Sequence, residues 1–161
     1  MSELLAQPTV LLALVGVLAL LFGLIRIRRE KMDTPVLINT ALLLALTVVL
    51  EQVRIFHMPQ GGSVTAGAMV PLLLIAYRFG MGTGALAGFV YGIINMIQDP
   101  FILHPVQVLF DYPLPFMAMG LAGISRQHLY LGTGLAFLTR FACHFISGVV
   151  FFGSYAPEGM S

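Results

Sequence analysis

The chain has 161 residues, of which 58% carry apolar side chains and 9% are Asp, Glu, Lys or Arg, whereas charged residues make up roughly 25% of an ordinary soluble domain. So few charges cannot cover the surface of a soluble protein of this length, and so apolar a chain is not intrinsically disordered. A formal net charge of +1 offers no basic surface for nucleic acid, and the single cysteine, Cys143, excludes an internal disulfide and a zinc knuckle. The composition therefore predicts an all-α integral membrane protein without a nucleic-acid partner.

Six segments are long and apolar enough to cross a bilayer as helices, because a hydrocarbon core of about 30 Å requires about 20 mostly apolar residues. Charged residues, glycines and prolines separate these segments. In chain order they cover residues 8–25, 35–50, 64–78, 81–97, 105–124 and 129–152. We therefore expect a bundle of about six transmembrane helices.

The distribution of positive charge predicts the orientation of this bundle, since short cytoplasmic loops carry an excess of Lys and Arg. When the loop after the first segment is placed inside, the inner side receives Arg26, Arg28, Arg29, Lys31, Arg78 and Arg126, six of the eight basic residues. Arg54 then lies outside, Arg140 lies within the last segment, and both termini face outward. The charges of the first segment follow its apolar run, which favours a retained helix over a secretory signal. We expect a multi-pass protein of a prokaryotic cell membrane.

Small residues recur at helical spacing on two segments. Glycines occupy every fourth position from Gly80 to Gly92 on the fourth segment, and this spacing predicts a central, closely packed helix. Ala41 and Ala45 form a similar pair on the second segment. Such a pair serves either packing within the chain or docking of another membrane protein.

Two of the ionisable residues at membrane depth stand out, and each such residue costs about 2.5 to 3.5 kcal/mol on insertion scales and so requires a partner or a function. Asp111 and His144 each lie about two turns inside the outer end of their segments, so the two side chains reach a similar depth if the helices are neighbours. Gln107 and His104 extend the face of Asp111 toward the outside. We expect one cavity lined by both clusters. An ion pair between Asp111 and Arg140, or a His144 that only bonds a neighbouring helix, is the structural alternative.

Aromatic and small residues surround this polar pair. Gly148, Phe152 and Tyr155 share the helical face of His144, and Tyr112 follows Asp111. The glycine leaves room for a ligand and the rings supply flat walls, although an aromatic belt at the membrane interface explains the rings equally well. The two prolines that follow Tyr112 remove backbone donors and predict a local break in the fifth segment.

Catalytic and metal-binding patterns are missing from the sequence. Cys143 and His144 are adjacent on a helix, so their side chains point about 100° apart and do not form a nucleophile–base pair. The four histidines show no i,i+4 pair, and the sequence has no GxSxG, P-loop or dinucleotide-binding motif. We therefore expect neither an enzyme nor a metal or cofactor site.

Three motifs together resemble the thiamin-specific S component of energy-coupling factor transporters. They are MPQGGS at residues 58–63, HPVQVLFDY at 104–112 and HFISGVVFFGSYAPEG at 144–159, and the resemblance covers about residues 35–159. It implies a small membrane protein that captures thiamin from outside. In that family two cytoplasmic ATPases and a membrane scaffold protein then complete uptake.

The resemblance assigns roles to individual residues. Asp111 and Tyr112 stand where the family has a carboxylate and a tyrosine, His144 and Gly148 match its pocket histidine and glycine, and Phe152 takes an aromatic position. The alanine pair of the second segment matches the pair through which such components dock on the scaffold. Thiamin is a permanent cation, which suits a carboxylate and aromatic rings, whose faces attract a desolvated cation by about 2 kcal/mol.

The sequence departs from the family pattern at both ends. The family continues into a further C-terminal helix, whereas this sequence stops at Ser161 and carries an additional helix at its start. The resemblance thus divides the chain into residues 1–34, an extra N-terminal transmembrane helix with a basic cytoplasmic loop, and residues 35–161, an S-component-like five-helix membrane domain. An S component for a thiamin precursor, or a truncated membrane protein that binds no vitamin, remains the alternative.

Overall fold

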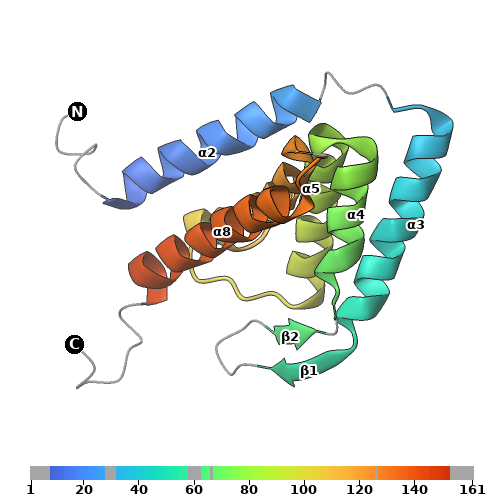
Figure 1. Cartoon of the computed structure of the whole chain (residues 1–161). Helices are drawn as coiled ribbons and strands as arrows, with labels where there is room; N and C mark the ends of the chain where they lie inside the picture. The colour runs from blue at the N-terminus through green and yellow to red at the C-terminus, as the bar shows by residue number, and fades with distance from the viewer. Residues whose placement is uncertain (1–7, 28–31, 58–62, 66, 126, 153–161) are drawn as a thin grey trace.

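The computed structural model of the chain describes residues 8–27, 32–57, 63–65, 67–125 and 127–152. Its helices pack side by side in one bundle, and a small β-hairpin lies at one end (Figure 1). In the described residues the helices fall into six consecutive segments, as the sequence predicts. The protein is an all-α membrane protein, and two of its helical stretches, Thr34–Glu51 and Leu129–Phe151, are long and apolar enough to cross a bilayer.

The first two helices lie at the outside of the bundle (Figure 1). Helix α2 (Pro8–Ile27) packs against the fifth segment and α5, and α3 (Thr34–Glu51) packs mainly against α4. A proline in its first turn favours the start of α3, because the N–H that proline lacks has no helical partner there. Both helices expose large apolar side chains: Leu14, Phe22, Leu42 and Val49. In water these surfaces would be unfavourable, and we assign them to the hydrocarbon.

The hairpin was not predicted. Strands β1 (Arg54–His57) and β2 (Ser63–Thr65) pair in antiparallel register with an irregularity after Arg54. The expected start of the third segment at residue 64 is therefore wrong, because residues 63–65 form a strand and helix α4 (Met69–Phe79) begins later. Gly67 adopts a positive φ of 79° between strand and helix, a conformation that favours glycine.

Helix α5 (Met81–Gln98) follows α4 after one residue, Gly80, whose φ is 103°. The glycine-rich face of α5 lies directly against the fifth segment. A Cβ at Gly88 would lie 2.0 Å from the carbonyl oxygen of Phe116, and one at Gly92 would lie 2.6 Å from that of Tyr112. The prediction of a central, closely packed helix is confirmed, since only glycine permits these backbone contacts.

The fifth segment is broken, as its prolines predict. It consists of α6 (Pro105–Asp111), α7 (Pro113–Met117) and a 3-10 helix, η1 (Ala118–Ile124). Pro113 has no N–H to continue the hydrogen bonding of α6, so the helix axis restarts at this residue. The predicted extent of the segment, residues 105–124, and the predicted break within it are both confirmed.

The last segment consists of α8 (Leu129–Ser147) and a π-helical turn, η2 (Gly148–Phe152), instead of one regular helix. Single π turns occur mostly within helices and often at functional sites. Helix α8 packs against α6, α7 and η1, so its C-terminal half lies beside the residues around Asp111.

The core lies where α4, α5, α7, η1 and α8 meet. Tyr91 and Phe116 form its centre, with ring centroids 4.8 Å apart in an edge-to-face arrangement. The buried core residues are Leu72, Ile75, Ala76, Ala87, Tyr91, Phe116, Met119, Ala122 and Ala136. This core fixes α8 against the broken fifth segment and thereby positions the polar residues described next.

Candidate functional site

Asp111 and His144 come together as the sequence predicts. The Nδ1 atom of His144 lies 3.5 Å from Oδ1 of Asp111, with the histidine side chain 41% exposed and the aspartate side chain 18% exposed. Asp111 ends α6 and His144 lies in the last turn of α8, so the packing of these two helices creates the pair. A carboxylate and an imidazole are thus available side by side to a ligand.

Gln107 lies behind this pair. Its side chain is fully buried, at 0% exposure. Its Nε2 donates hydrogen bonds to Oδ2 of Asp111 at 2.5 Å and to the carbonyl of Phe101 at 3.0 Å, and its Oε1 accepts from the N–H of Leu103 at 2.9 Å. The amide is therefore engaged entirely within the protein.

Tyr112 is also held by the chain. Its side chain is 6% exposed, and its hydroxyl donates to the carbonyl of Asp99 at 2.8 Å and accepts from the N–H of Phe101 at 2.7 Å. Both the ring and the hydroxyl of Tyr112 are therefore buried within the protein, and the residue supports the segment around Asp99 and Phe101.

His104 caps the start of α6 and joins it to the last segment. Its Nδ1 accepts a hydrogen bond from the N–H of Val106 at 3.2 Å, and its ring stacks on Phe151, with centroids 5.2 Å apart and planes 21° apart. This stack links α6 to η2 at the same end as the carboxylate and the imidazole. The sequence placed His104 on this face and did not predict its partner.

Arg140 turns away from the pair. Its guanidinium lies over the ring of Phe116, 4.5 Å from the centroid, and its Nη1 contacts Sδ of Met69. The structure therefore does not contain the ion pair between Asp111 and Arg140 that we considered as the structural alternative. Glu51, which is 7% exposed at the end of α3, interacts electrostatically with Arg140 and with Tyr91. Glu51 is thus a buried acid that interacts with a partly buried base, Arg140.

The structure describes some of the remaining predicted site and docking residues and not others. A Cβ at Gly148 would meet no heavy atom of the described residues within 4 Å, so the space beside η2 is open. Phe152 ends η2, although its side chain is outside what the structure describes, and Tyr155 lies outside the described residues. Ala41 and Ala45 are exposed on α3.

The segment from Asp99 to Leu103 was missed by the sequence analysis. Oδ2 of Asp99 forms an ion pair with Nη1 of Arg54 at 3.0 Å, and backbone groups of this segment bond Gln107 and Tyr112. Arg54 lies in β1, so the ion pair joins the hairpin to the polar cluster. The only signal in the sequence is a charged residue followed by a proline between two predicted helices, which does not specify these contacts.

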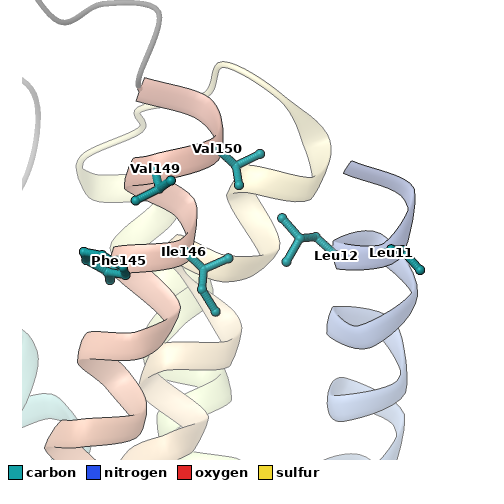
Figure 2. Close-up of a pocket in the computed structure, with 6 residues that line it drawn as sticks. All are labelled: Leu11, Leu12, Phe145, Ile146, Val149 and Val150. Atoms are coloured by element: carbon teal, nitrogen blue, oxygen red, sulfur yellow. The ribbon is translucent and has the colours of Figure 1, made fainter. Parts of the chain in front are cut away.

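A separate pocket opens between α2 and the last segment. It has a volume of about 370 Å³ and is lined by Leu11, Leu12, Phe145, Ile146, Val149 and Val150. Figure 2 shows Leu12 of α2 facing Ile146 and Val150 across this space. Because all six side chains are apolar, the pocket offers no group to compensate the charge of a cation or to bond a polar ligand. The pair of Asp111 and His144 remains the candidate site.

Comparisons with known proteins identify the family of the chain. The model of the family described as thiamine transporter protein matches residues 37–161. The chain is 37% identical to thiamine transporter ThiT of Bacillus subtilis (strain 168), in a match that covers 76% of this chain and 73% of that protein. It is 28% identical to thiamine transporter ThiT of Lacticaseibacillus paracasei, over 81% and 75% of the two chains. The chain therefore belongs to the thiamine transporter protein family.

Proposed function

We propose that this protein captures thiamin at the outer face of a prokaryotic cell membrane as the S component of an energy-coupling factor transporter. Membership of the family supports thiamin as the ligand. The observation that carries the proposal is the approach of Asp111 to His144 at 3.5 Å. We further propose that residues 1–34 are an addition to a five-helix domain of residues 35–161.

The chemistry of thiamin matches the groups around this pair. Thiamin joins a cationic thiazolium to an aminopyrimidine, so Oδ1 of Asp111 supplies charge compensation or accepts from the amino group. His144 offers a hydrogen bond to the polar parts of the vitamin. The proposed binding residues are Asp111, Tyr112, His144, Gly148, Phe152 and Tyr155, with Gln107 behind the carboxylate.

Equilibrium dialysis of the purified protein with labelled thiamin tests this proposal. We expect saturable binding, and we expect Asp111→Asn combined with His144→Ala to weaken it by at least about 100-fold, since both removed groups form charge-assisted contacts. Asp33→Asn is the matched control, because Asp33 is exposed before α3. Undiminished binding by the double variant would contradict the site.

Competition binding distinguishes an S component for thiamin from one for a thiamin precursor. Unlabelled thiamin should displace labelled thiamin at lower concentration than its separate pyrimidine and thiazole precursors, because only thiamin carries both rings. Stronger displacement by a precursor would reassign the ligand. A correctly folded protein without saturable binding of any of the three would identify a membrane protein that does not bind the vitamin.

We propose that α3 docks on a membrane scaffold protein that carries two ATPases. Ala41 and Ala45 are exposed on this helix beside Leu42, and small residues allow close approach of another helix. Replacing both alanines by tryptophan should abolish co-purification with the co-expressed scaffold and ATPases while thiamin binding persists. Ala19→Trp is the control, because Ala19 is exposed on α2. Retained co-purification of the double variant would contradict this docking surface.

A further inference from the structure

We propose that Gln107 is a positioning residue that orients the Asp111 carboxylate and leaves one defined oxygen, Oδ1, for the ligand. This inference rests on the proposed function for its ligand. The orientation of the Asp111 carboxylate is a property of the ligand-free protein, so it can be tested without thiamin.

The two oxygens of Asp111 have different partners. Oδ2 accepts the hydrogen bond from Nε2 of Gln107 at 2.5 Å, whereas Oδ1 lies 3.5 Å from Nδ1 of His144. Gln107 is fully buried and His144 is 41% exposed, so the first oxygen points into the protein and the second toward the accessible side. A carboxylate that rotated freely would offer either oxygen to the ligand, and ordering it on binding would weaken affinity.

The bonds of Gln107 require an amide at this position. One N–H donates to Asp111 and the other to the carbonyl of Phe101, while the amide oxygen accepts from the N–H of Leu103. A glutamate would place its acceptor oxygens against the Asp111 carboxylate and the Phe101 carbonyl. An apolar residue would leave those groups without a donor in a buried place.

The backbone segment that bonds Gln107, residues 99–103, is itself held by other side chains. The hydroxyl of Tyr112 bonds the carbonyl of Asp99 and the N–H of Phe101, and Arg54 forms an ion pair with Asp99. The segment that bonds Gln107 is therefore tied both to α6 and to the hairpin. A side chain supported in this way holds a binding group more accurately than one that bonds only its own helix.

Infrared spectroscopy of ligand-free protein tests the orientation. With aspartate labelled with carbon-13 at its carboxyl group, the chain contributes three labelled side chains, and the Asp111 band is the one lost in Asp111→Asn. We expect Gln107→Met to shift the carboxylate stretching band of Asp111, because it removes the donor to Oδ2. Gln98→Met is the matched control, since Gln98 is exposed at the end of α5. An unchanged Asp111 band in Gln107→Met would overturn the inference.

A double-mutant cycle on thiamin affinity tests the consequence. Gln107→Met should weaken binding roughly 10- to 100-fold, the range expected for loss of a hydrogen bond to a charged group. In the Asp111→Asn background the same change should have a clearly smaller effect, because Gln107 acts through the carboxylate. Equal fold losses in both backgrounds would indicate general damage to the structure and overturn the inference.

The test also covers two other results, a Gln107→Met variant that does not fold and a wild-type protein that does not bind thiamin. If Gln107→Met does not fold, Gln107→Asn retains an amide that is one methylene shorter and should shift the Asp111 band in the same way. If the wild-type protein does not bind thiamin, the proposed function fails, and the infrared comparison alone decides whether Gln107 orients Asp111.

Discussion

Asp111 and His144 show at the scale of single residues how a membrane protein accommodates ionisable groups. Each would be costly in hydrocarbon, and each has a partner in the other, 3.5 Å away. Their spacing on two helices predicted a common depth. The choice of His144 rather than Arg140 as the partner of Asp111 followed from the rotation of α8, which places the guanidinium over Phe116.

Gly148 gives a prediction at the same scale. Because a Cβ there meets no described heavy atom within 4 Å, Gly148→Leu should fill open space without lowering the melting temperature. If the space receives thiamin, the variant should lose at least about tenfold in affinity, since overpacking a binding space costs roughly 1–3 kcal/mol. Gly134→Leu is the control, because Gly134 of α8 has equally open surroundings. Dialysis and thermal unfolding measure the two effects, and equal affinities of the two variants would contradict the prediction.

At the scale of elements, the packing of α5 against the fifth segment depends on backbone contact. Its glycines predicted this role because small residues let helices approach in a membrane. The sequence did not specify which helix they contact, and the structure shows α7 and η1 there, including the break at Pro113. The break itself was predictable because proline acts through local backbone chemistry.

Gly88→Ala should destabilise the protein. The new Cβ would lie 2.0 Å from a backbone oxygen, which moves only with the helix that carries it, so we expect a loss of about 1–3 kcal/mol or more in the free energy of unfolding. Gly134→Ala should instead raise stability by about 0.5–1 kcal/mol through helix propensity. Unfolding in detergent followed by circular dichroism measures both, and a Gly88→Ala protein as stable as the wild type would refute the close contact.

The hairpin gives a second prediction for an element. The side chains of Arg54 and Asp99 are 27% and 36% exposed, so their ion pair should contribute at most about 1 kcal/mol. Arg54→Gln and Asp99→Asn remove the same interaction, and each should speed hydrogen exchange of the β1 amides. The double variant should exchange no faster than the faster single variant, whereas additive effects would show that the two residues act independently.

At the scale of the whole molecule, the candidate site lies at one end of the bundle. The end of η1 lies beside the junction of α4 and α5, where a Cβ at Gly123 would be 2.4 Å from the carbonyl oxygen of Ala76. Arg54, Asp99 and the site residues lie at the other ends of these helices. Apolar faces of α2, α3 and α8 surround the bundle between these ends. This arrangement agrees with a protein that spans the bilayer, and the excess of positive charge predicts that the candidate site faces outward.

Labelling of single cysteines tests this orientation. In a Cys143→Ala background, Gln98→Cys at the end of α5 should react with a membrane-impermeant maleimide in intact cells. Gln127→Cys, exposed before α8, should react only after the membrane is permeabilised. The opposite pattern would invert the orientation predicted from positive charge.

The sequence by itself determined the class of the protein, the six helical segments, the central glycine-rich helix and the two ionisable residues near one end. These properties are local, because the bilayer requires long apolar helices and penalises each charge wherever it occurs. Only the tertiary structure decided that Gln107 is buried against Asp111, that Phe151 stacks on His104, and that residues 54–57 and 63–65 form a hairpin. Such contacts depend on the rotation of each helix about its axis and on segments distant in the chain, which periodicity alone does not specify.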